Sequence, residues 1–113
     1  MSAITTHVLD TARGRPAAGI SVSLDQMDAL GTWKPIARGA TDADGRLRNL
    51  MPADTPAAPG TYRLVFETAA YFEAQGVEGF YPLVVVTFTV GEEPHYHVPL
   101  LLSPFGYSTY RGS

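Results

Sequence analysis

Short segments in which apolar and polar residues alternate run along most of this chain, and Gly, Pro or Asp residues separate them. In residues 20–26, Ile20, Val22 and Leu24 alternate with polar residues. A period of two places every second side chain on one face of a strand, which predicts half-buried β-strands. By this pattern, or by a run of β-branched and aromatic residues, strands are also predicted over residues 4–10, 33–40, 62–68, 82–90, 95–102 and 107–111, with a short one around Leu47.

Only residues 68–76 have a composition that favours a helix. Thr68 is predicted to cap this helix, and Gly76 is predicted to end it. About eight short strands with one short helix predict an all-β fold, an antiparallel β-sandwich. The length of 113 residues fits one hydrophobic core, so residues 1–113 are predicted to form a single domain.

The composition excludes several classes of function. The chain has no cysteine, which removes disulfides, thiolate zinc sites and thiol nucleophiles. A net charge of -3 without any basic run makes nucleic acid an unsuitable partner. No export signal is seen at the N-terminus, and no apolar run approaches the roughly 20 residues of a membrane helix. We therefore expect a cytoplasmic protein with neither nucleic-acid nor membrane partners.

Strand alternation assigns two histidines to the outer face of the sandwich. In residues 4–10, Ile4 and Val8 share one face and His7 lies on the other. In residues 95–102, the apolar face begins with Tyr96, and His97 lies on the opposite face. Two interpretations remain open at this point. The histidines are either exposed surface residues, or they face a cleft in which a neutral imidazole takes up a proton near pH 7.

A metal site is an alternative for the same histidines. His95 and His97 lie on one strand face, and His7 would be the third ligand. No carboxylate or thiol is obviously placed with them, whereas a catalytic zinc site usually holds three protein ligands in a closed geometry. We therefore predict no metal.

The turn before the short strand contains Asp-Ala-Asp-Gly at residues 42–45. Its sequence is similar to part of a calcium-binding loop. The rest of that pattern, including the distal glutamate, is missing, so a tight turn is predicted instead. Arg46 follows this turn immediately. A guanidinium held at a strand start can bind an anion or a developing oxyanion; otherwise Arg46 is a solvated surface residue.

Three stretches together resemble a known family: THVLDTARGRPA (residues 6–17), TDADGRL (41–47) and HYHVPLLLSPFGYSTYRGS (95–113). They are similar to the 5-hydroxyisourate hydrolase family, the transthyretin-like enzymes of purine catabolism. The resemblance covers essentially the whole chain. The terminal Tyr-Arg-Gly-Ser is specific only in combination with the other stretches.

This resemblance implies a transthyretin-like (prealbumin-like) sandwich of two four-stranded sheets, assembled as a homotetramer, a dimer of dimers. The active sites would lie in a channel between dimers. The implied reaction opens a cyclic amide, converting the small-molecule substrate 5-hydroxyisourate to 2-oxo-4-hydroxy-4-carboxy-5-ureidoimidazoline in the urate-to-allantoin branch. No metal or organic cofactor is implied.

The resemblance also implies the site residues. The catalytic set is His7, Arg46, His97 and Ser113, and the substrate-binding set is His7, Arg46, Tyr110, Arg111 and Gly112. The two histidines would share water activation and proton relay, and which of them is the base stays open. Arg46 would stabilise the oxyanion and Tyr110 would orient the planar ring. Ser113 would act through its hydroxyl or through a terminal carboxylate, and Gly112 would leave room for the bound ring.

Two other functions compete with a hydrolase. A non-catalytic small-ligand binding protein, similar to the transthyretin carriers, would use the same channel without turnover. Such a pocket has no need of His7, Arg46 and His97, which favours the enzyme. A β-sandwich accessory domain of a larger secreted enzyme is the other alternative.

Overall fold

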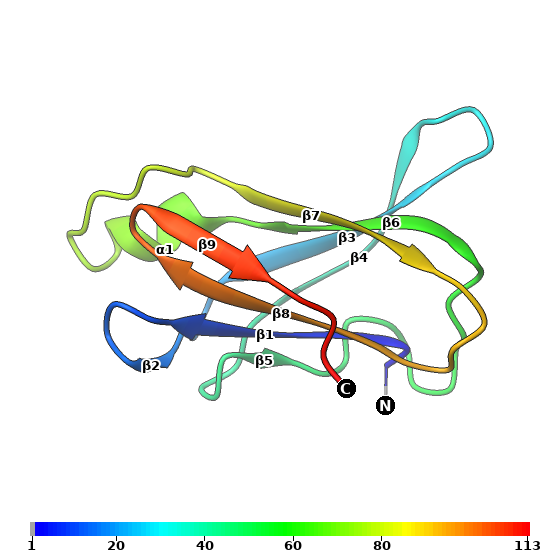
Figure 1. Cartoon of the computed structure of the whole chain (residues 1–113), viewed down its shortest axis with the longest axis horizontal. Coiled ribbons are helices and arrows are strands. Elements are labelled where there is room, and N and C mark those ends of the chain that lie inside the picture. Colours follow the sequence, from blue (N-terminus) through cyan, green and yellow to red (C-terminus); the bar gives the residue numbers. More distant parts are fainter. Residues whose placement is uncertain (1) are drawn as a thin grey trace.

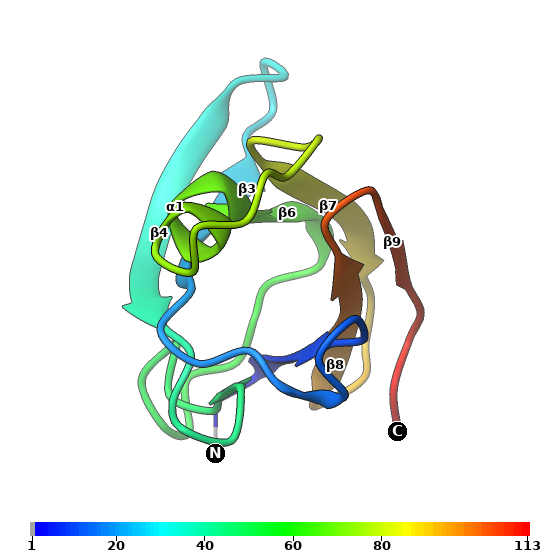
Figure 2. The same cartoon turned by 90° about the vertical axis from the view of Figure 1, so that its left-hand side faces the viewer.

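Two β-sheets pack face to face around a common interior (Figure 1), which is seen end-on in Figure 2. The computed structural model describes residues 2–113. One sheet contains, in spatial order, β4 (Trp33–Ala40), β3 (Ser21–Met27), β6 (Gly60–Phe66) and β7 (Val84–Val90). The other contains β2 (Arg15–Pro16), β1 (Ile4–Asp10), β8 (Tyr96–Ser103) and β9 (Gly106–Thr109), with β5 (Arg46–Leu47) also paired to β1.

The predicted all-β sandwich is confirmed, with two differences in detail. The second sheet has five strands instead of four, because the two-residue strands β2 and β5 both pair with β1. The pairing of β1 with β8 is parallel, whereas an antiparallel sandwich was expected. A parallel pair needs a long crossover, and most of the chain lies between these two strands.

Within residues 2–113 there is one helix, α1 (Thr68–Glu73), which ends three residues before the predicted boundary, and Gly76 ends the turn that follows it. Gly76 has a φ of 67°, its N–H donates to the Glu73 carbonyl, and the next N–H donates to the Phe72 carbonyl. These are the bonds of a left-handed glycine cap. The predicted capping role of Thr68 is wrong, because its hydroxyl donates instead to the Tyr81 carbonyl at 2.7 Å. No helix within residues 2–113 is long and apolar enough to cross a membrane.

Alternation along the strands builds the core. Full burial of one large apolar side chain contributes about 2 kcal/mol. The largest side chains with almost no exposure come from both sheets: Ile4, Val8, Ile20, Val22, Leu24, Tyr62, Leu64, Phe66, Val84, Val90, Leu100 and Leu102. The predicted faces of β1 and β8 are therefore confirmed, and His7 and His97 lie half-buried on the outer face.

The turn of residues 42–45 is fixed directly to β1. The Asp42 carboxylate accepts hydrogen bonds from the main-chain N–H groups of Asp44 (2.9 Å) and Arg46 (3.0 Å), so the predicted tight turn is confirmed. Gly45 has a φ of 74°, and its carbonyl accepts the Val8 N–H at 2.8 Å. Because Gly45 precedes β5, this contact also sets the position of Arg46.

Replacement of Gly45 by alanine should destabilise the protein strongly. A Cβ there would lie 2.4 Å from the Val8 carbonyl oxygen, in addition to the strain of the positive φ. We expect the free energy of unfolding to fall by at least about 3 kcal/mol. Gly14→Ala is the matched control, since Gly14 has a φ of 66° and no atom within 4 Å of the added Cβ.

The control should cost only about 1 kcal/mol, because left-handed strain alone opposes it. Differential scanning calorimetry at one protein concentration measures both variants. Equal losses of stability would contradict the assigned contact between the turn and β1.

Candidate functional site

A shallow pocket of about 180 Å³ lies on the outer face of the sheet that contains β1 and β8. Its lining residues include Thr5, Arg46, Arg48, His95, His97 and Ser113. Strand pairing explains why they meet. Thr5 lies opposite His97 in the parallel pair of β1 and β8, and Gly112 forms a bridge with His97 that brings Ser113 to the pocket. Residues far apart in sequence thus form one site.

Arg46 is the cation at this pocket with an unengaged side chain. Its main-chain N–H is bonded to the turn, whereas its guanidinium has no hydrogen-bond or ion-pair partner within residues 2–113. Arg48 lies 3.6 Å from the Asp42 carboxylate (Nη1 to Oδ2). Arg46 is therefore available to an anion or to a carbonyl oxygen that gains charge.

His7 lies beside Arg46 in the β1–β5 pair, but it does not line the pocket. Its Nε2 is 2.9 Å from the Asp44 carbonyl oxygen. A carbonyl only accepts, so Nε2 carries the proton and Nδ1 of the neutral ring keeps its lone pair. Burial, followed by the positive charge of Arg46, lowers the pKa of His7 from its ordinary value.

His97 is held by hydrogen bonding and by burial. Its Nδ1 lies 2.8 Å from the Thr5 hydroxyl, which also lies 2.9 Å from Nε2 of His95. Burial lowers the pKa of His97, and the nearby charges of His95, Arg46 and His7 lower it further. His97 is therefore neutral near pH 7, which is the state that a general base requires.

Gly112 allows the terminal segment to lie directly against the His97 ring. A Cβ at this position would be 2.6 Å from Cδ2 of His97 and 3.3 Å from Cγ of Pro99. The sequence suggested that Gly112 leaves room for a bound ring. In the structure the imidazole takes that room, and the effect of Gly112 is to hold His97 between the chain end and Thr5.

Arg111 is exposed and lies against an aromatic ring. Its Cζ is 4.8 Å from the centroid of the Tyr96 ring. Tyr110 is 57% exposed, and with Arg111 it lines a second groove of about 200 Å³, which His97 and residues of β7 also line. The structure therefore does not place these two side chains with Arg46 and Ser113, and their substrate-binding roles stay predictions.

Sequence reasoning missed Thr5 as part of the site. The signal was available, because Thr5 is two residues from His7 and so shares its outer face. The sequence names His95 as a ligand in the metal alternative and leaves open whether it supports the site or is a surface residue. Within residues 2–113, no group of three or more His, Asp or Glu side chains could hold a metal ion. His95, just before β8, and His97, within β8, both lie within hydrogen-bonding distance of the Thr5 hydroxyl.

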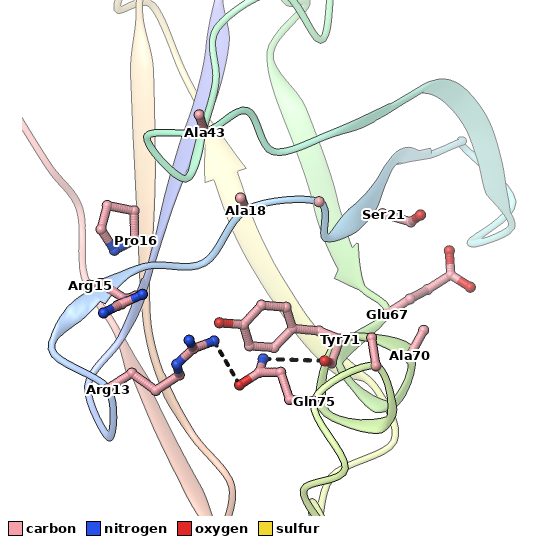
Figure 3. Close-up of a pocket in the computed structure, with 12 residues that line it drawn as sticks. Arg13, Arg15, Pro16, Ala18, Ser21, Ala43, Glu67, Ala70, Tyr71 and Gln75 are labelled. Atoms are coloured by element: carbon pink, nitrogen blue, oxygen red, sulfur yellow. Dashed lines mark hydrogen bonds between the residues drawn. The ribbon is translucent and has the colours of Figure 1, made fainter.

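A larger pocket of about 500 Å³ lies between α1 and the segments that flank β2 (Figure 3). Several of its polar side chains are engaged with one another or with nearby residues. Arg13 donates to Gln75 at 3.0 Å, and the Tyr71 hydroxyl donates to the buried Asp10 carboxylate at 2.7 Å. This pocket contains no histidine and shares no lining residue with the pocket at His97. Acid–base chemistry is therefore assigned to the smaller pocket.

Comparison with known proteins places this chain among relatives of two kinds. A 5-hydroxyisourate hydrolase of Salmonella dublin is 47% identical over 111 residues, covering 97% of this chain and 80% of the relative. The structure of Klebsiella pneumoniae 5-hydroxyisourate hydrolase is 37% identical with a TM-score of 0.86, covering 99% of this chain and 100% of the other.

Sea bream transthyretin, in a structure with thyroxine, is 37% identical with a TM-score of 0.90, covering 98% of this chain and 95% of the other. The model that describes the HIUase/Transthyretin family matches residues 4–112, nearly the whole chain. The chain belongs to the HIUase/Transthyretin family.

Proposed function

We propose that this protein is a 5-hydroxyisourate hydrolase of urate degradation, a metal-independent enzyme that opens a cyclic amide. The observation that supports this most directly is the meeting of Arg46, His97 and Ser113 in one pocket, with His7 beside Arg46. Its relatives in Salmonella dublin and Klebsiella pneumoniae carry the name of this activity. A cytoplasmic location stays a prediction.

The histidines supply the acid–base steps of the proposed reaction. Nε2 of His97 takes a proton from water, and the resulting hydroxide attacks the amide carbonyl carbon of the substrate. The C–N bond of the tetrahedral intermediate then breaks, and the leaving nitrogen takes up a proton. The lowered pKa of both histidines keeps them neutral at pH 7, so each can accept a proton before it donates one.

Arg46 supplies the electrostatic part of the mechanism. As the carbonyl carbon becomes tetrahedral, negative charge develops on its oxygen. A guanidinium with no protein partner can donate a hydrogen bond to this oxygen and a second, parallel hydrogen bond to a neighbouring substrate oxygen. One well-placed donor of this kind contributes about 3 kcal/mol to transition-state stabilisation.

A homotetramer, a dimer of dimers, would complete the site. The pocket is shallow in one protomer, and water weakens electrostatic stabilisation. Half-buried Leu9 and Leu101 share the outer face with His7 and His97, so a second copy would bury apolar surface while covering the pocket. Tyr110 is 57% exposed and would be available to a neighbouring protomer in this assembly.

Size-exclusion chromatography with light scattering should therefore give four times the chain mass of 12.1 kDa. A charge placed in the proposed contact, Leu101→Glu, should split the tetramer, because a buried unpaired carboxylate is costly. Leu30→Glu is the matched control, since Leu30 is 91% exposed in the β3–β4 turn. A wild-type monomer would contradict the assembly.

A non-catalytic carrier of small ligands is the second candidate function. The likeness to sea bream transthyretin supports it, and the fold cannot distinguish the two because both neighbours share it. Freshly generated 5-hydroxyisourate decays spontaneously with loss of ultraviolet absorbance. A carrier would leave that rate unchanged, whereas an enzyme accelerates it.

Loss of the Arg46 side chain should lower kcat about 100-fold, the equivalent of about 3 kcal/mol. The comparison uses Arg46→Ala and the control Arg38→Ala, whose side chain is 71% exposed on β4. The ultraviolet decay assay gives kcat and KM for both. If Arg46→Ala converts the substrate at the wild-type rate, Arg46 does not stabilise the oxyanion.

Replacement of Gly112 by alanine should lower kcat about tenfold or more while the protein stays folded. The added Cβ forces either the His97 ring or the terminal segment out of place, and misplacement by about 1 Å is enough for a large loss of rate. Gly106→Ala is the matched control in the same segment, because its Cβ would make only an ordinary contact of 3.7 Å with Ser103. Wild-type kinetics in both variants would show that the Gly112–His97 contact has no part in catalysis.

A further inference from the structure

Thr5 joins two imidazoles on the outer face of the sheet. Its hydroxyl oxygen lies 2.8 Å from Nδ1 of His97 and 2.9 Å from Nε2 of His95. Thr5 is only 5% exposed, and the ring centroids of the two histidines are 6.3 Å apart with an interplanar angle of 21°. The three side chains, which all line the pocket, therefore form a series of hydrogen bonds that runs from His97 through Thr5 to His95.

The number of protons on Thr5, His95 and His97 allows their two hydrogen bonds to run in only one direction at a time. A hydroxyl has one proton and donates once, and each neutral imidazole carries one N–H. If both rings donated to Thr5, its own proton would need a third acceptor, and none lies within hydrogen-bonding distance in residues 2–113. One histidine therefore donates to Thr5, and Thr5 donates to the other.

We propose that Thr5 and His95 are positioning residues that select the tautomer of His97. In the proposed direction, Nδ1–H of His97 donates to the Thr5 oxygen, and the Thr5 hydroxyl donates to Nε2 of His95. Nε2 of His97 then keeps its lone pair. This inference rests on the proposed hydrolase function, because it assigns a purpose to the lone pair that His97 presents to the pocket.

The chemistry of the reaction selects this direction over the reverse. Nδ1 of His97 is occupied by Thr5, so only Nε2 is left to meet a water molecule or the substrate. With its lone pair on Nε2, His97 takes a proton as the water O–H bond breaks, and the imidazolium still donates from Nδ1. The Nε2–H bond later breaks to protonate the leaving nitrogen. In the reverse direction Nε2 carries a proton and cannot act as a base.

The surroundings of His97 explain why an uncharged hydrogen-bond partner suits the position of Thr5. Burial, followed by the nearby charges of His95, Arg46 and His7, lowers the pKa of His97 and so favours the uncharged ring. A carboxylate in place of Thr5 would raise the pKa of His97 and leave more of the base protonated at pH 7. The Thr5–His95 pair fixes the tautomer without adding a charge.

The tautomer can be read directly in the full-length, substrate-free protein. Nitrogen-15 NMR of the imidazole rings, in the pH range where His97 is neutral, distinguishes a protonated from an unprotonated ring nitrogen. We expect Nδ1 of His97 to be protonated and Nε2 to be unprotonated. A spectrum with the proton on Nε2 would overturn the proposal, whether or not the protein is active.

Kinetic variants test whether the selected tautomer matters. Thr5→Val removes the hydroxyl at nearly constant volume, and His95→Leu removes the final acceptor. Both should lower kcat about tenfold or more with little change in KM. Thr5→Ser and His95→Gln keep a hydroxyl and an acceptor, and they should recover most of the rate. Losses in the conservative pair equal to those in the disruptive pair would overturn the relay.

The pH profile separates positioning from a structural role. Thr5→Val deprives the His97 imidazolium of an acceptor, so the acidic limb of kcat/KM should move to lower pH. In the reverse arrangement the variant would deprive the neutral ring of a donor, and the limb would move to higher pH. No movement, or movement to higher pH, contradicts the proposal. Wild-type protein that fails to accelerate 5-hydroxyisourate decay would defeat the proposed function alone, because the NMR result still decides the tautomer.

Discussion

Parallel pairing of β1 with β8 is the interaction on which both the core and the site depend. Its register sets Ile4 and Val8 of β1 among the buried side chains of the two sheets, which supplies the burial that stabilises the sandwich. The same register places Thr5 opposite His97 on the outer face. A shift of one residue would exchange the faces of a strand, so the hydrophobic core holds the polar site in place.

Two close approaches of the main chain set the remaining site residues. Gly45 brings the turn of residues 42–45 against β1 and so positions Arg46 beside His7. Gly112 brings the chain end against the His97 ring and so positions Ser113 at the pocket. A side chain at Gly45 would collide with the Val8 carbonyl oxygen, and one at Gly112 would collide with the His97 ring. Close contacts of the main chain at these two glycines therefore assemble the site as much as the strands themselves do.

Much of the site was predictable because alternation is a local property of a strand. His7 and His97 fall on the outer face by counting in twos, and the motifs that carry the family resemblance add Arg46. The roles of Thr5 and His95 were not predictable in this way, since they depend on which strand lies beside β1. The contact of Arg111 with the Tyr96 ring could not be predicted for a similar reason. It depends on the approach of Tyr96, fifteen positions earlier in the chain.

The sequence by itself determined the class of fold, the faces of the strands and the family of this protein. Periodicity and motifs depend only on residues that are close together in the sequence, so they can be recognised before the chain is folded. Only the tertiary structure decided that β1 and β8 are parallel, that one hydroxyl serves two histidines, and that Gly112 makes room for His97. These features arise from contacts between residues about 90 to 100 positions apart, or from a few ångströms of close packing. A hydrogen bond requires a distance and a direction, and neither exists until the chain has folded.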